Sequence, residues 1–132
     1  MTASNDMCMN AIGLPTYEGG AATATGSTVN ATIDTSVVGS AFCGTEIKAP
    51  GVWYYNDGGG GDQGMGGMRA STCTENTTPA YDTAISVFTT GADDDDEECG
   101  DLVCIGGDDD DLNCVDNQSA SSLTWASEPG RR

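Results

Sequence analysis

The chain has 132 residues, with 21 acidic and four basic side chains, no histidine and a formal net charge of −17. Such an acidic surface repels phosphate backbones and anionic lipid headgroups, which argues against nucleic-acid binding. No apolar run approaches the roughly 20 residues that span a bilayer, so no membrane span is expected. The length favours one domain, and six cysteines and two tryptophans in strand-like runs argue against a disordered chain.

The first part of the chain divides into a lead-in and the start of a domain. Residues 1–18 form an N-terminal lead-in, interpreted as a linker or an exchanged segment that Cys8 anchors, and residues 19–132 form a single β-sandwich domain. Alternating Ala and Thr with glycine breaks over 19–34 predict short, partly exposed strands. We expect Phe42–Gly44 to return the chain to the core.

Residues 52–55 are the most strand-like segment. Alternation places Trp53 and Tyr55 on one face and Val52 and Tyr54 on the other, which suits a strand with one face in the core and the other under a loop. With Trp125, these aromatic residues could also form a platform for sugar stacking. The core interpretation is favoured over the sugar platform, because such residues more often fill a sandwich.

The rest of the chain continues the strand pattern. Alternation over 68–72 predicts a strand, Ile85 and Val87 share one face of another, and 102–105 is an apolar run that Gly106-Gly107 is expected to stop. A last strand is predicted over 121–125. No apolar spacing of i, i+3, i+4, i+7 lasts three turns, so the predicted fold is all-β, an antiparallel sandwich or jelly roll.

Six cysteines without histidine favour three disulfides in an oxidising compartment over zinc or reactive thiols. The expected disulfide cysteines are Cys8, Cys43, Cys73, Cys99, Cys104 and Cys114. Six cysteines allow 15 connectivities. One arrangement is Cys8–Cys43 across the lead-in, Cys73–Cys99 between two strands and Cys104–Cys114 around an acidic loop.

An oxidising compartment indicates an extracellular or cell-surface location, and three acceptor sequons support it. The sequons predict N-linked glycans at Asn30, Asn76 and Asn117. No secretory apolar region follows Met1, so the sequence is interpreted as a mature or excised piece of a longer chain.

Two acidic clusters interrupt the second half of the chain. Solvated loops that keep the protein soluble explain both clusters. The alternative is Ca²⁺ coordination, which needs six to eight oxygen ligands. The better candidate is the second cluster, Asp108, Asp109, Asp110 and Asp111, whereas Asp93–Glu98 resembles an insertion.

The sequence lacks a recognisable catalytic set. It has no histidine and no G-x-S-x-G elbow, and its acids occur in runs rather than on opposed apolar walls that would separate their pKa values. We therefore expect a protein that is not an enzyme.

Several ordered motifs point to a family. N-D-M-C-M-N-A near the start, A-P-G-V-W-Y, S-T-C, D-T-A-I-S-V-F, C-G-D-L-V-C and S-S-L-T-W-A-S-E-P-G resemble the pre-peptidase C-terminal type of β-sandwich, over roughly residues 5–130. The versions most similar to it occur in secreted and cell-surface proteins of microbes and algae. The resemblance implies a fold rather than a function, because such modules accompany proteases, adhesins and matrix proteins.

Members of that family usually carry one more strand after the E-P-G turn, where this sequence has Arg131-Arg132. A sandwich without its last strand has an open edge that another strand can fill. Such a strand could also follow residue 132. The leading hypothesis is thus a structural extracellular glycoprotein module that self-associates into a fibre or matrix by strand complementation, with itself or other matrix proteins and glycans as partners. The alternatives are a glycan-binding or adhesion module and an accessory domain of a secreted hydrolase.

Overall fold

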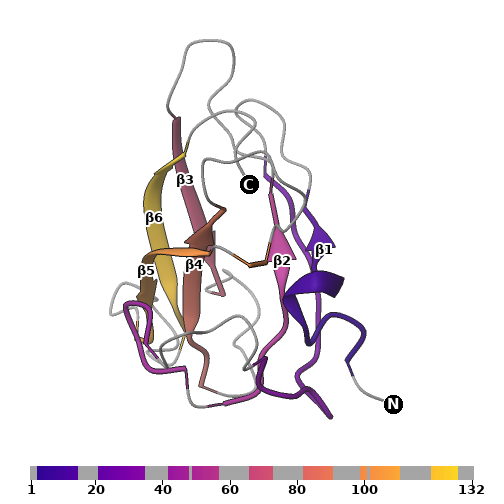
Figure 1. The fold of residues 1–132 in the computed structure, drawn as a ribbon. Coiled ribbons are helices and arrows are strands. Elements are labelled where there is room, and N and C mark those ends of the chain that lie inside the picture. The colour runs from indigo at the N-terminus through magenta and orange to yellow at the C-terminus, as the bar shows by residue number, and fades with distance from the viewer. Residues whose placement is uncertain are drawn as a thin grey trace.

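The structure is a computed structural model that describes residues 3–14, 21–34, 42–47, 49–56, 66–72, 82–90, 99–100, 102–110 and 120–127. Strands are the main regular secondary structure of this part of the chain, which confirms the predicted all-β class. Within these ranges, one 3-10 turn, η1 (Cys8–Asn10), precedes six strands (Figure 1): β1 (Ile12–Gly13), β2 (Tyr54–Tyr55), β3 (Gly66–Ser71), β4 (Ile85–Thr89), β5 (Val103–Asp108) and β6 (Ser122–Ser127).

The strands form three two-stranded sheets. β3 pairs with β6 and β4 pairs with β5, both antiparallel, whereas β1 and β2 are parallel. Parallel neighbours need a long crossover. The chain between Gly13 and Tyr54 supplies it, so this pair departs from the antiparallel pattern that the sequence predicts.

The β4–β5 sheet lies between the other two, which gives the molecule its sandwich-like layering. On one side, the side chain of Leu123 in β6 approaches Gly106 in β5. On the other side, the ring of Phe88 in β4 packs against Trp53, just before β2, with ring centroids 5.8 Å apart. Figure 1 shows the β1–β2 pair across β4 from β6.

A buried hydroxyl network joins the ends of β3, β4, β5 and β6. Ser121 is fully buried, and its N–H donates to Thr72 Oγ1 at 2.9 Å while its carbonyl accepts from the Thr72 N–H at 2.9 Å. Its hydroxyl lies 2.7 Å from the Asp109 carbonyl oxygen and also contacts the Thr83 carbonyl. Since a hydroxyl carries one proton, it donates to one of these oxygens at a time.

The described part of the lead-in, residues 3–14, packs on its own chain. Asn5 exchanges two hydrogen bonds with the Trp53 backbone, at 2.8 and 2.9 Å. The Cys8 N–H donates to the buried Asp34 carboxylate at 2.8 Å, and the Thr32 hydroxyl donates to Asp6 at 2.9 Å. β1 then runs beside β2.

Several strand boundaries differ from the prediction. Residues 21–34 contain a turn but no strand, and Gly26 lies against the side chains of Tyr54 and Val52 rather than joining a ladder. Only Tyr54 and Tyr55 of the segment 52–55 pair, yet its two-faced packing is confirmed: Trp53 meets Phe88, and Tyr54 lies under the loop that contains Gly26.

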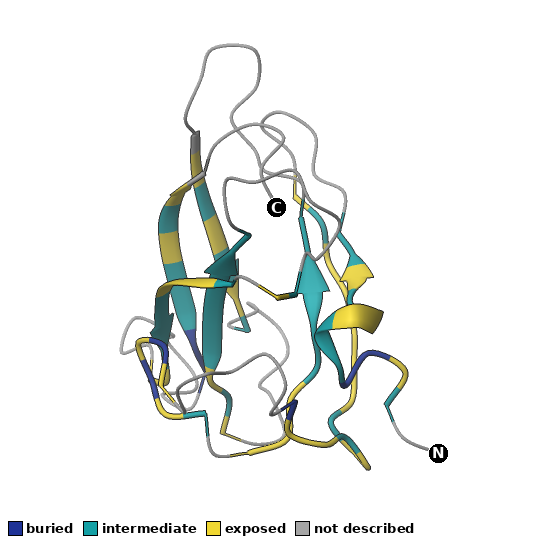
Figure 2. Ribbon diagram, viewed as in Figure 1, coloured by how far each residue is buried: buried dark blue, intermediate teal, exposed yellow. Residues whose placement is uncertain are grey.

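The core of the described residues is small. Cys43 and Ala120 are the buried apolar residues in this part of the chain, and the other buried side chains are polar. In Figure 2 most strand residues are intermediate rather than buried. Among the described residues, disulfides and buried hydrogen bonds therefore hold the strands together more than buried apolar side chains do.

Candidate functional site

A tight loop at 42–46 docks on the β4–β5 sheet. Phe42 and Glu46 form an isolated antiparallel β-bridge, and the Cys43 N–H donates to the Thr45 carbonyl at 3.0 Å. Gly44 has a φ of 70°, in the left-handed region that favours glycine. A side chain on Gly44 would overlap the backbone of Gly107 in β5. These glycines allow the loop to lie directly on the sheet.

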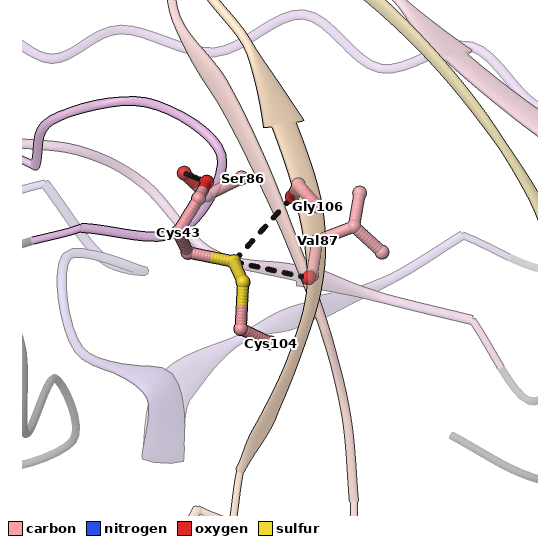
Figure 3. Close-up of a disulfide and its surroundings, with 5 residues drawn as sticks. All are labelled: Cys43, Ser86, Val87, Cys104 and Gly106. Atoms are coloured by element: carbon pink, nitrogen blue, oxygen red, sulfur yellow. Dashed lines mark hydrogen bonds between the residues drawn. A yellow bond between two sulfur atoms is a disulfide. The ribbon is translucent and has the colours of Figure 1, made fainter.

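The Cys43–Cys104 disulfide fixes this loop to β5, with a Cα–Cα distance of 5.6 Å. Figure 3 shows the Cys43 sulfur above the sheet, 3.5 Å from the Val87 carbonyl oxygen and 3.4 Å from that of Gly106. A disulfide sulfur carries no proton, so both are packing contacts rather than hydrogen bonds. The hydroxyl of Ser86 donates to the Cys43 carbonyl at 3.1 Å.

A β-bulge sets the position of Cys104. Val87 pairs with Gly106 and Phe88 pairs with Cys104, so Ile105 is one extra residue on β5. An extra residue shifts the alternation of side chains, so that residues on its two sides face differently than in a regular strand. The bulge thereby brings Cys104 to the same side of the sheet as Ser86, where Cys43 lies.

The first half of β5 is open to solvent, whereas its second half is covered. Val103 is 54% exposed, Ile105 43% and Phe42 59%. Each of the three residues is adjacent in sequence to a cysteine of the same disulfide. We call these three residues the β5 patch. Its side chains are uncharged, on a protein with a net charge of −17; Val103 and Ile105 belong to β5, and Phe42 belongs to the 42–46 loop. The sequence predicted that Phe42 returns to the core, and it predicted 102–105 only as a short apolar run.

The disulfides confirm the use of cysteine but not the suggested pairing. Cys8 bonds Cys99 and Cys43 bonds Cys104, so the pairs Cys8–Cys43, Cys73–Cys99 and Cys104–Cys114 are wrong. The suggestion joined cysteines near one another in sequence. The observed bonds instead span 91 and 61 residues, because the lead-in and the 42–46 loop fold back onto later parts of the chain.

Cys73 and Cys114 lie outside the described residues. The expected third disulfide would have to join these two, since the other four cysteines are paired with one another. That bond stays a prediction.

The proposed calcium ligands have different surroundings. The Asp108 carboxylate accepts the Ser122 N–H at 2.9 Å, and the Asp109 carbonyl faces the Ser121 hydroxyl. Asp109 and Asp110 are exposed, and Asp111 lies outside the described residues. Across the described ranges, no three acidic or cysteine side chains are grouped as a metal site. Calcium binding stays a prediction.

Of the three sequons, the structure describes the one at Asn30, which is exposed in a turn, while Asn76 and Asn117 lie outside the described residues. Trp53, Tyr54, Tyr55 and Trp125 are all half-buried. Trp53 packs on Phe88, an arrangement that belongs to the sandwich interior. Within the described residues, no helix is long and apolar enough to cross a membrane.

Comparisons with protein-family models, with curated proteins and with solved structures gave no match. The candidate function therefore depends on the geometry of this chain alone.

Proposed function

We propose that this chain is a structural, non-catalytic module of an extracellular fibre or matrix, related to the pre-peptidase C-terminal sandwiches, and that it associates with copies of itself by strand addition. The observation that carries the proposal is how the described strands pair. Each described sheet has two strands, so each described strand has one neighbour. Two-stranded sheets are marginally stable alone, and unpaired edges are templates for another strand.

The β5 patch supplies the surface for that contact. Val103 and Ile105 combine strand geometry, high exposure and lack of charge. A chain of net charge −17 repels its copies most strongly where carboxylates are dense. Two copies therefore approach at a lower electrostatic cost through Val103 and Ile105 than through a surface rich in carboxylates.

The two disulfides support an oxidising extracellular location, because such bonds are rare in reducing compartments. They also limit how strands are exchanged. An exchanged lead-in would remake its contacts on the neighbour, as swapped elements do. The Cys8–Cys99 bond would then join two subunits covalently.

Negative-stain electron microscopy of untreated protein tests the proposal. We expect regular filaments or mats, and their loss on chelation would place Ca²⁺ in the contact. A non-reducing gel separates the two routes of assembly. If the lead-in is exchanged, the gel shows a ladder of covalent oligomers that reductant converts to monomers. If the filaments form by edge pairing, they run as monomers on the non-reducing gel. Dispersed single particles at every concentration would contradict self-association and favour a glycan-binding module.

Lysine substitutions test the surface itself. Val103→Lys with Ile105→Lys should abolish filaments while leaving the fold intact, because both side chains are exposed and edge lysines block pairing. The control is Val29→Lys with Ile33→Lys, which makes the same charge change at exposed residues outside any described strand. Both variants reduce the negative charge, so a loss confined to the β5 pair cannot come from repulsion. Equal filament formation by the two variants would exclude the β5 patch.

A further inference from the structure

Asn30 lies at the tip of a hydrogen-bonded turn. The Ala31 N–H donates to the Thr28 carbonyl at 3.0 Å, and Asn30 has a φ of 61°, a left-handed conformation that asparagine tolerates. Asn30 is exposed and its neighbour Val29 is 71% exposed. A sugar on the Asn30 amide would thus extend into solvent without displacing any described part of the fold.

Thr32, whose hydroxyl completes the sequon, is also exposed, and its hydroxyl is engaged by the lead-in. Thr32 Oγ1 donates to the Asp6 carboxylate at 2.9 Å, and Asp6 is 8% exposed. Enzymatic transfer to asparagine requires a hydroxyl at the second following position. In the folded chain, the lead-in holds that hydroxyl.

The Cys8–Cys99 disulfide fixes the lead-in where Asp6 accepts the hydrogen bond from Thr32. The capture of the Thr32 hydroxyl by Asp6 can become permanent only after this disulfide has formed. Asp6 is two residues from Cys8, and Cys99 follows Asn30 by a long stretch of chain. At about 5–20 residues per second, several seconds of synthesis separate the two positions. During that interval the disulfide cannot yet fix the lead-in, so nothing holds Asp6 permanently against the Thr32 hydroxyl.

We propose that Asn30 carries an N-linked glycan and that its transfer precedes the capture of the Thr32 hydroxyl by Asp6, so that glycosylation and closure of the lead-in occur in a fixed order. This inference rests on the proposed extracellular location. The donor is a lipid diphosphate-linked oligosaccharide. The Asn30 amide nitrogen bonds to the anomeric carbon and loses a proton, and the bond from that carbon to the lipid diphosphate breaks, which releases the diphosphate.

An in vitro transfer reaction tests the order. The unglycosylated chain, oxidised and folded or reduced and alkylated, is incubated with an oligosaccharyltransferase and lipid-linked oligosaccharide, and mass spectrometry measures the peptide that contains Asn30. We expect the unfolded chain to be modified at least tenfold faster. Equal rates would overturn the order, and no transfer to Asn30 in the unfolded chain would overturn the site. Neither outcome depends on filament formation, so the failure of this inference is distinguishable from that of the proposed function.

Two variants of Asp6 isolate the hydroxyl. Asp6→Ala removes the acceptor of the Thr32 hydrogen bond, while Asp6→Asn keeps an acceptor oxygen there. Transfer to the folded Ala variant should be faster than to the folded Asn variant, with the Cys8–Cys99 bond confirmed in both by peptide mapping. Equal rates in the two would contradict the role of Asp6. If the Asp6→Ala variant fails to form the Cys8–Cys99 disulfide, the comparison of folded and unfolded wild-type chains still tests the proposed order.

Discussion

Gly44 and Gly107 contact each other through their backbones, where the 42–46 loop lies on β5. A Cβ at Gly107 would overlap the Cys43 carbonyl and lie 2.8 Å from that of Ile85. Because both obstacles are backbone atoms, neither can move aside cheaply. We expect Gly107→Ala to lower the free energy of unfolding by at least about 2 kcal/mol. Urea unfolding under non-reducing conditions measures this.

Gly67→Ala is the matched control. Gly67 lies in β3 and is exposed, and a methyl group at its Cα would have no neighbouring atom within 4 Å among the described residues. Alanine there should be neutral or stabilising by up to about 1 kcal/mol, since it restricts the unfolded chain. Similar losses at Gly67 and Gly107 would show that the close approach at Gly107 is unimportant.

These glycines also show where sequence reasoning reaches its limit. The pair Gly106-Gly107 predicts the end of a strand, but β5 continues through both to Asp108. Glycine is a poor strand former because of its backbone entropy. Here the close approaches of Leu123 and of the Cys43 loop override that preference. Such contacts join residues far apart in the chain and leave no local signal.

At the scale of elements, the two described disulfides should contribute unequally. The loop-entropy model gives each about 4 kcal/mol, because spans of 61 and 91 residues differ little on a logarithmic scale. Their packing differs at one cysteine: Cys43 is 1% exposed against β4–β5, although its partner Cys104 is exposed, whereas Cys8 and Cys99 are both half-buried. Replacing Cys43 and Cys104 by alanine should therefore cost at least about 1 kcal/mol more than replacing Cys8 and Cys99.

Denaturant unfolding of the two double variants, with the remaining cysteines oxidised, makes the comparison. Equal losses would mean that loop entropy alone accounts for both bonds. A larger loss for the Cys8 and Cys99 pair would instead mean that the lead-in carries more of the stability than the 42–46 loop.

The strands were predictable where the tertiary packing agrees with the local sequence pattern. The alternation of Ile85 and Val87 predicted β4, and the run to Trp125 predicted most of β6. The disulfide pairing was not predictable, because it follows from a bulge at Ile105 and a loop that folds back from Cys43. The β5 patch was missed for the same reason: exposure is set by which half of β5 the neighbouring strands cover.

At the scale of the whole molecule, repulsion between like charges lowers the stability of the folded state. The net charge is −17, and Arg69 is the one basic side chain among the described residues. Raising NaCl from about 10 to 150 mM shortens the screening length from roughly 30 to 8 Å. We expect the midpoint of thermal unfolding to rise by several degrees, because self-repulsion destabilises the compact state. A midpoint that is flat or falls with salt would show that this repulsion does not limit stability.

Divalent ions then separate screening from binding. At equal ionic strength, Mg²⁺ and Ca²⁺ screen alike, but a site of flexible carboxylates and carbonyls prefers Ca²⁺. If Asp108–Asp111 bind calcium, the midpoint should rise further in CaCl₂ than in MgCl₂, since a ligand that binds only the native state stabilises it. Asp110→Asn, at an exposed position, should remove the difference while keeping the response to NaCl. Identical unfolding curves in the two salts would show that the acidic loop is a solvated surface and not a calcium site. Assembly would then depend on the β5 edge and on screening alone.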